Sequence, residues 1–237
     1  MKVVLFCGGL GLRMGEGSAR VPKPMAKVGD EPILLHIMRY YAHYGHREFV
    51  LCLGYNGDVI RAELPEYGLE EWDVTFAETG LTSNVGERLL AVRSIVEGEE
   101  LFLANYGDGL CDFPLPRLVE RVQSSGKTAA FLRVRPTFFF HTVKVGRDDA
   151  VLAVEDHTAL DLWVNGGYFC FRPTIFDYIE GGEELVEEPF RRLIAKGELL
   201  ALEHDGFWAP MDTLKDKQRL DLLAENDPPW AVWEGGA

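Results

Sequence analysis

The residues best suited to chemistry stand at the front of the chain. A strand-like run from Lys2 to Cys7 leads into Gly8-Gly9-Leu10-Gly11-Leu12-Arg13, and Lys23 follows shortly after. Glycines placed directly after a buried strand let backbone N–H groups approach phosphate oxygens at no steric cost. Arg13 and Lys23 would add the fixed positive charge that a polyphosphate needs. The pattern predicts a nucleotide-binding loop that contains Gly8, Gly9 and Gly11.

Two better-known glycine loops do not fit this segment. The dinucleotide-binding fingerprint needs a third glycine at position 14, where the chain has Met14, and an acidic residue that ends a second strand. The Walker loop needs Gly-Lys-Ser or Gly-Lys-Thr at its end, and no such tripeptide follows. A glycine-rich turn with an incidental arginine remains the structural alternative.

Two aspartates lie where a metal ligand would be useful. Asp108 stands between two glycines at the end of the apolar run 101–104, so it is either a turn residue or a metal ligand. Asp212 stands just before the last predicted helix, where the simpler interpretation is an N-cap. Both aspartates near one phosphate-binding loop would suit Mg²⁺ bridging a triphosphate.

Alternating strand and helix patterns must position these groups. We expect strands at Val3 to Cys7, Phe49 to Gly54, Val74 to Ala77 and Leu101 to Asn105, with a helix from Pro32 to about Gly45. This alternation predicts a mostly parallel sheet, in which ligands bind beyond the carboxyl ends of the strands. The glycine loop and Asp108 both fall there.

The second half of the chain is richer in short strands. We expect strands at Thr128 to Val134, Val143 to Val145, Val151 to Val154 and Tyr168 to Phe171, and a hairpin turn at Arg147 to Asp149. Three helices are expected at Pro173 to Ile179, Glu188 to Ala195 and Thr213 to Glu225. Pro228-Pro229 and the Gly235-Gly236-Ala237 end predict a loosely held tail, and the acidic runs 97–100 and 183–188 predict solvated surface.

Composition limits the class of protein. With 237 residues, 47% of them hydrophobic, the chain suits one domain over 1–237. The net charge of −14 argues against nucleic acid, and an acidic protein that binds anions must build a local positive site. We find neither an apolar run of membrane-spanning length nor a signal-peptide layout, and therefore expect a soluble, cytoplasmic protein without a membrane partner. The four cysteines are expected to be buried thiols.

Together these segments resemble the sugar-phosphate nucleotidyltransferase family, and Gly206 to Lys217 resembles its cytidylyltransferase branch. The resemblance runs over nearly the whole chain and includes the glycine loop, Tyr106 to Gly109 and Val164 to Gly167. It implies a Rossmann-like, mostly parallel mixed sheet flanked by helices, the nucleotide-diphospho-sugar transferase fold, with a small β-rich acceptor-binding part. It also implies that residues 1–125 mainly bind the nucleotide and that residues 126–237 mainly bind the acceptor and supply the C-terminal helices.

The resemblance further implies a reaction and a set of site residues. An acceptor phosphate, of the glucose 1-phosphate type, would attack the α-phosphate of CTP and release pyrophosphate. Arg13 and Lys23 would be catalytic, Gly8, Gly9, Gly11, Arg13 and Gly86 would bind the nucleotide, and Asp108 and Asp212 would hold Mg²⁺. Glu155, Asp156, Asn165 and Gly166 would bind the acceptor. No side-chain nucleophile is needed, because an ionised phosphate is already nucleophilic.

One departure from the family pattern concerns the acceptor. Where the cytidylyltransferases have Glu-Lys-Pro, this chain has Glu155-Asp156-His157, so a carboxylate replaces the lysine that would approach the acceptor phosphate. His157, Lys144 and Arg133 are candidates to compensate. The alternative acceptor is a phosphorylated amine, a phosphorylated amino acid or a phosphonate, and a catalytically silent nucleotide-binding module is the alternative of another class. The sequence leaves homo-oligomer formation open.

Overall fold

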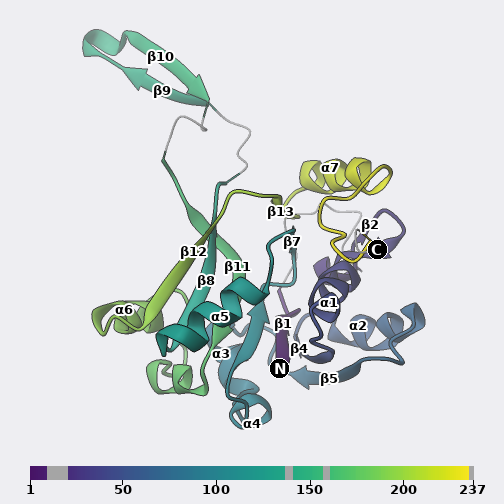
Figure 1. Cartoon of the computed structure of the whole chain (residues 1–237). Helices are drawn as coiled ribbons and strands as arrows, with labels where there is room; N and C mark the ends of the chain where they lie inside the picture. The colour runs from purple at the N-terminus through teal and green to yellow at the C-terminus, as the bar shows by residue number, and fades with distance from the viewer. Residues whose placement is uncertain (10–20, 137–140, 157–160, 235–237) are drawn as a thin grey trace.

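A seven-stranded sheet forms the centre of the computed structural model, which describes residues 1–9, 21–136, 141–156 and 161–234 (Figure 1). Its strand order is β12-β8-β11-β6-β1-β4-β5. β11 runs antiparallel to β6 and β8, and the other neighbouring pairs are parallel. The prediction of a mostly parallel mixed sheet is therefore confirmed. The strands are β1 (Lys2–Phe6), β4 (Glu48–Leu53), β5 (Asp73–Glu78), β6 (Phe102–Asn105), β8 (Ala129–Val134), β11 (Val164–Phe171) and β12 (Leu199–His204).

Both faces of the sheet are covered, which explains the continuous apolar runs of its central strands. Val3 and Leu5 of β1 pack into one hydrophobic core, and Val4 and Phe6 pack into a second core on the opposite face. The first core is closed by residues of α1 (Ile33–His43), α2 (Gly57–Glu63), α5 (Pro116–Ser125) and α7 (Leu214–Ala224). The second is closed by residues of α3 (Val85–Ala91), α4 (Arg93–Val96), the 3₁₀ helix η6 (Pro173–Tyr178) and α6 (Glu188–Ala195).

Short elements at the carboxyl edge of the sheet carry much of the candidate chemistry. Lys23 begins the 3₁₀ helix η2 (Lys23–Met25), which precedes β2 (Lys27–Val28) and β3 (Glu31–Pro32). β7 (Gly109–Cys111) follows β6 closely and pairs antiparallel with β13 (Trp208–Pro210). The remaining short helices of the described segments are η3 (Leu64–Tyr67) and η4 (Arg147–Asp149).

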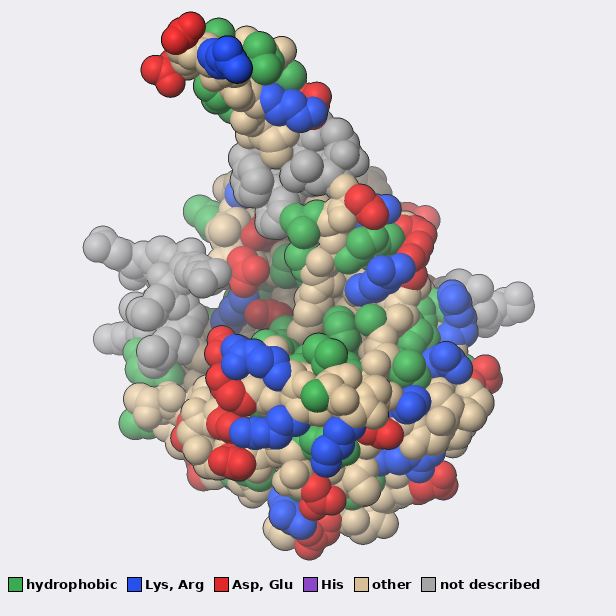
Figure 2. All heavy atoms as spheres, turned by 90° about the vertical axis from the view of Figure 1, so that its left-hand side faces the viewer, with side chains coloured by type: hydrophobic (Ala, Val, Ile, Leu, Met, Phe, Trp, Pro, Cys, Tyr) green, Lys and Arg blue, Asp and Glu red, His purple; other side chains and the backbone are tan. Residues whose placement is uncertain are grey.

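A two-stranded hairpin projects from the body of the molecule (Figure 1). It consists of β9 (His141–Val145) and β10 (Val151–Asp156), and the predicted turn at Arg147 to Asp149 is confirmed, with positive φ at Asp148 and Asp149. The strand pairing places four valines on one face, and each is more than half exposed: Val143, Val145, Val151 and Val154. Figure 2 shows the hairpin standing clear of the body, whose surface is hollowed below the base of the hairpin.

The C-terminal tail is held more firmly than the sequence predicts. Trp230 is 1% exposed, and its Nε1 donates a hydrogen bond to Nδ1 of His36 at 3.2 Å. The indole ring brings a large apolar surface into the core, and this outweighs the loosening effect of Pro228-Pro229. The prediction of a loose tail is therefore wrong for the segment around Trp230, and residues 235–237 lie outside the described part of the chain.

Two of the predicted helices differ slightly from the observed ones. The helix expected at Pro173 to Ile179 is the 3₁₀ helix η6, and the helix expected from Thr213 begins at Leu214, with Thr213 as its N-cap. All four cysteines are free and buried, as predicted. No helix among the described residues has the length and apolar character that a membrane crossing requires.

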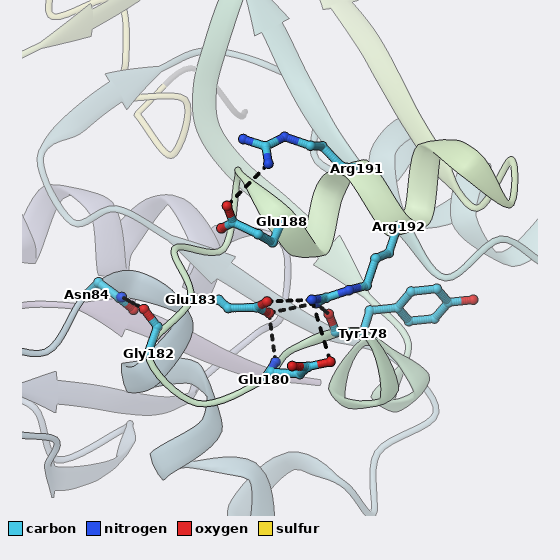
Figure 3. A network of polar contacts seen from close by, with 8 residues as sticks. All are labelled: Asn84, Tyr178, Glu180, Gly182, Glu183, Glu188, Arg191 and Arg192. Carbon is cyan, nitrogen blue, oxygen red and sulfur yellow. Dashed lines mark hydrogen bonds and ion pairs between the residues drawn. The ribbon is translucent and has the colours of Figure 1, made fainter.

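The acidic run 183–188 is only partly solvated surface. Glu183 accepts a hydrogen bond from Nη1 of Arg192 at 2.6 Å, and its side chain is 16% exposed (Figure 3). Arg192 also donates to the backbone carbonyl of Tyr178 and lies near Glu180. Glu183 therefore stabilises the loop before α6, which corrects the sequence-based expectation for this residue.

The contact between His36 and Trp230 predicts a specific acid sensitivity. Burial lowers the pKa of His36 below its ordinary value of 6.5, so the folded protein keeps the ring neutral while the unfolded chain binds a proton below about pH 6.5. The contribution of this histidine to stability should thus be lost as the pH falls below 6.5. Protonation at Nδ1 would also cancel the Trp230 hydrogen bond, worth on the order of 1 kcal/mol.

Thermal unfolding at pH 7.5 and pH 5.5 tests this prediction. His36→Gln should lose less stability on acidification than the original chain, because an amide can both accept from Trp230 and donate to Val28 without titrating. His43→Gln, at an exposed position of the same helix, serves as the control. An unchanged acid response in His36→Gln would contradict the prediction.

Candidate functional site

A lysine lies between two aspartates at the carboxyl edge of the sheet. Nζ of Lys23 is 2.7 Å from Oδ2 of Asp108 and 2.7 Å from Oδ1 of Asp212. The three residues come from η2, from the turn between β6 and β7, and from the turn between β13 and α7. The structure therefore brings together Lys23, Asp108 and Asp212, the charged residues that the sequence predicts at the phosphate and metal site and that lie within the described part of the chain.

The turn that carries Asp108 is set by its neighbours. Oδ1 of Asn105 accepts a hydrogen bond from the backbone N–H of Gly107 at 2.7 Å, and Gly107 has φ of +79°. A Cβ at Gly107 would lie 3.1 Å from the carbonyl oxygen of Phe6, so glycine is needed here for both conformation and space. The Asp108 carboxylate consequently leaves the sheet at the end of β6 in a defined direction.

The segment that carries Asp212 is aligned by β13. Pro210 pairs with Gly109, and the N–H of Met211 donates to the carbonyl oxygen of Asp108 at 2.8 Å. Asp212 is not the N-cap of α7, because the Thr213 side chain accepts from the N–H of Asp216 in a capping box. The Asp212 carboxylate is therefore free of a capping role and points to Lys23.

The electrostatics of this cluster favour a bound cation. Burial by itself lowers the pKa of Lys23, but Asp108 and Asp212 more than offset that effect, so the pKa is raised above the usual lysine value. The ammonium group marks the point that both carboxylates face. The described residues contain no group of three or more His, Cys, Asp or Glu side chains that could hold a metal, so a divalent cation bound by the two aspartates would need further ligands from water or a substrate.

Only part of the predicted glycine loop can be placed. Gly8 and Gly9 follow β1, and the carbonyl oxygen of Gly8 accepts from Nη2 of Arg88 at 2.9 Å. A Cβ at Gly9 would meet no atom within 4 Å, whereas one at Gly8 would overlap the Arg88 guanidinium. Gly11 and Arg13 lie outside the described residues.

The candidate acceptor residues fall into two groups. Asn165 donates from Nδ2 to the hydroxyl oxygen of Tyr106 at 2.9 Å, and the carbonyl oxygen of Gly166 accepts from Nε1 of Trp208 at 2.9 Å. These contacts place Asn165 and Gly166 beside the segments that carry the two aspartates. Glu155 and Asp156 instead belong to β10 of the projecting hairpin, where Glu155 pairs with Lys144 at 2.8 Å.

Gly86 is buried in a packing contact. It lies in the first turn of α3, and a Cβ there would overlap the backbone carbonyl of Glu183. Nδ2 of Asn84, the N-cap of α3, donates to the carbonyl oxygen of Gly182 at 3.0 Å in the same contact (Figure 3). Gly86 thus allows α3 to approach the loop before α6, and its part in nucleotide binding stays a prediction.

Four residues near the site make contacts there although the sequence assigned them no individual role: Asn105, Tyr106, Arg88 and Trp208. One signal was present, because Asn105-Tyr106-Gly107 and Asn165-Gly166-Gly167 share an Asn-x-Gly spacing. In both segments the asparagine Oδ1 accepts from the glycine N–H, and both glycines have positive φ. Arg88 had no comparable local signal, because its partner Gly8 is 80 residues away in sequence. Trp208 lies in the segment that resembles the cytidylyltransferases, but its contact with Gly166 could not be predicted from that segment alone.

Comparisons with known proteins agree with this architecture. The sequence profile of the nucleotidyl transferase family matches residues 2–216. Glucose-1-phosphate cytidylyltransferases of Salmonella typhimurium and Salmonella typhi are each 35% identical over 257 aligned positions, covering 99% of this chain and all of theirs. The structure of a UTP-bound UGPase from Acinetobacter baumannii superposes with a TM-score of 0.70 at 17% identity, covering 96% of this chain and 95% of the other, which shows the shared fold. The chain therefore belongs to the nucleotidyl transferase family and is a nucleotidyltransferase.

Proposed function

We propose that this enzyme transfers the cytidylyl group of CTP to a sugar 1-phosphate, forming a CDP-sugar and pyrophosphate in a Mg²⁺-dependent reaction. The observation that carries the proposal is the position of Lys23 between Asp108 and Asp212 at the carboxyl edge of the sheet. The choice of CTP and of a glucose 1-phosphate-like acceptor rests on the 35% identity to the Salmonella enzymes over 99% of this chain.

The chemistry requires alignment and charge neutralisation. An oxygen of the acceptor phosphate attacks the α-phosphorus of CTP, a new P–O bond forms, and the bond to the β-phosphate oxygen breaks to release pyrophosphate. Lys23 would hold positive charge against the reacting phosphates, and the backbone N–H groups of Gly8 and Gly9 would face the phosphate oxygens. Arg13, outside the described residues, remains the proposed contact for the β- and γ-phosphates.

The two aspartates fit a hard divalent cation. Both carboxylates already converge on one cation, the Lys23 ammonium, and carboxylate oxygens are the ligands that Mg²⁺ prefers. When bound, Mg²⁺ would neutralise charge on the triphosphate as the pyrophosphate leaves. Asp108 and Asp212 would hold that cation, while Lys23 would move from between them towards the phosphates.

A second acceptor class also needs a test, because two of the three candidate compensating charges, those of Lys144 and Arg133, are already paired, and His157 lies outside the described residues. Lys144 pairs with Glu155, and Arg133 pairs with Glu203 and lies over the ring of Trp163 at 4.5 Å. Neither side chain is free to replace the positive charge that the family lysine would supply at position 156. This favours an acceptor with its own cation, such as a phosphorylated amine or amino acid, as the second candidate.

Pyrophosphate release tests the proposal. We would assay each of the four nucleoside triphosphates with Mg²⁺ against sugar 1-phosphates, phosphorylated amines and phosphonates. Turnover with CTP and a sugar 1-phosphate is expected. Turnover with CTP and only a phosphorylated amine or a phosphonate would replace the sugar by the second acceptor class, and no turnover with CTP would refute the assigned nucleotide.

The variant Asp156→Lys separates the two acceptor classes. Restoring a lysine should raise kcat/KM for sugar 1-phosphates and lower it for phosphorylated amines, each by about tenfold, because one favourable or repulsive charge contact is worth about 1.4 kcal/mol. Asp148→Lys, in the turn of the same hairpin, controls for the general change in charge. An acceptor preference that does not change in Asp156→Lys would show that position 156 does not face the acceptor.

A further inference from the structure

A buried guanidinium ties together three loops at the carboxyl edge of the sheet. Arg88 of α3 is 4% exposed, and its Nη2 donates to the carbonyl oxygen of Gly8 at 2.9 Å. Its Nη1 donates to the carbonyl oxygens of Leu53 at 3.1 Å and Gly80 at 3.0 Å, and to Oγ1 of Thr79 at 2.7 Å. The loops that follow β1, β4 and β5 therefore depend on one side chain.

The space around this guanidinium explains two glycines. A Cβ at Gly8 would overlap the Arg88 guanidinium itself. At Gly54, a Cβ would lie 2.8 Å from Nη1 of Arg88 and 2.7 Å from the carbonyl oxygen of Gly8. Gly8, the first glycine of the predicted phosphate loop, is thus required because any side chain there would overlap Arg88. A ligand bound at the loop would be a second reason for glycine at this position.

The charge of Arg88 has no acidic partner in the described part of the chain. All its hydrogen-bond acceptors are neutral, and Arg88 is in none of the ion pairs found there. Burial raises the pKa of Cys52 to about 12 and that of Cys7 well above its usual value, so both nearby thiols stay neutral. Glu87, its neighbour in sequence, forms no ion pair with Arg88 and is engaged in the capping box of α3. Burial lowers the pKa of Arg88, and the charge of Glu87 offsets this effect only in part. A buried cation without a paired counter-charge is costly, and a bound anion would repay that cost.

We propose that Arg88 is the positioning residue of the triphosphate site: it holds the carbonyl groups of Gly8, Leu53 and Gly80 so that the N–H groups of Gly8 and Gly9 face the phosphates. The geometry suits arginine, because the planar guanidinium donates from Nη2 to Gly8 and from Nη1 to Leu53 in fixed directions, whereas a lysine would present one flexible ammonium group. The proposal rests on the proposed function in one respect, namely that this edge of the sheet binds a nucleoside triphosphate.

Arg88→Lys and Arg88→Gln in the full-length protein test this role. Calorimetric titration with CTP and Mg²⁺ should show affinity at least about tenfold weaker in both variants, since small misplacements at such sites can cost far more than the contacts themselves. The KM for the nucleotide should rise, while the KM for the acceptor should stay within about twofold. Arg93→Lys, at an exposed arginine paired with Glu97, serves as the matched control.

The outcomes separate this proposal from the proposed function. Full nucleotide affinity in folded Arg88→Lys, or an equal rise in both KM values, would overturn the positioning role and leave Arg88 a structural residue. If the original chain binds a different triphosphate, the assigned nucleotide is wrong, and weaker binding of that triphosphate in the Arg88 variants would support the positioning role while unchanged binding would overturn it. If it binds no triphosphate at all, both proposals are overturned. Thr79→Val, which removes only one acceptor of Arg88, gives the same comparison with a smaller expected effect if the Arg88 variants do not fold.

Discussion

Lys23→Met is expected to lower turnover by at least about 100-fold, on the scale of removing one preorganised charged donor. The same change should strengthen the binding of a divalent cation in the absence of nucleotide. The physical reason is that the Lys23 ammonium lies 2.7 Å from both carboxylates and so competes for the position that a metal would take. Methionine fills a similar volume without the charge, and leaves both carboxylates available.

Mn²⁺ binding measured by electron paramagnetic resonance, without nucleotide, checks the second half of this prediction. The dissociation constant should fall by about tenfold or more, because removing a cation 2.7 Å from each carboxylate relieves a strong electrostatic competition. Lys27→Met is the matched control, since Lys27 is an exposed lysine of β2. Unchanged Mn²⁺ affinity in Lys23→Met would mean that the two aspartates do not form the metal site, and retained turnover would remove Lys23 from the catalytic machinery.

Asp212→Asn should separate catalysis from stability. Turnover is expected to fall by about 100-fold or more, because the change removes one of two carboxylates proposed to hold the metal, and metal stabilisation of a transition state is worth several kcal/mol. The melting temperature should change little, since Thr213, rather than Asp212, caps α7. The Asp212 side chain is also 44% exposed, so the amide of an asparagine there could be hydrated and would not be a buried polar group without a partner.

Thr213→Ala should have the opposite effect, lowering stability while leaving turnover unchanged. Loss of the capping box should destabilise the protein by about 1 kcal/mol, while turnover at a temperature where the variant is folded should stay near the original value. Thermal unfolding and steady-state kinetics on both variants complete the comparison. If Asp212→Asn lowered the melting temperature as far as Thr213→Ala does and kept its activity, Asp212 would be a structural residue.

Local sequence patterns predicted most of the elements. The strand that leads to Asp108 and the hairpin turn at Arg147 to Asp149 were predicted from runs of a few residues each. The helix from Glu188 to Ala195 was predicted with its observed bounds. These features depend on the spacing of buried residues along a helix or strand and on the residue types in turns. Both act within one element, so they can be predicted from the sequence. The family resemblance added the candidate roles of Lys23 and the aspartates.

Contacts between distant segments could not be predicted in this way. Trp230 and His36 are 194 residues apart in sequence, and Arg88 and Gly8 are 80 apart. The composition of the tail predicted a loose end, yet a single buried indole holds the segment around Trp230. Arg88 had no local signal, because its four acceptors come from three different loops.

By itself, the sequence determined which residues could do chemistry: a glycine loop after a buried strand, Lys23 beyond it, and aspartates at Asp108 and Asp212. Only the tertiary structure decided that Asp212, 189 residues from Lys23, shares one ammonium group with Asp108 and is not a helix cap. The physical reason is that local patterns specify strands, helices and turns, whereas the meeting of three charged side chains depends on strand order and on the pairing of β7 with β13.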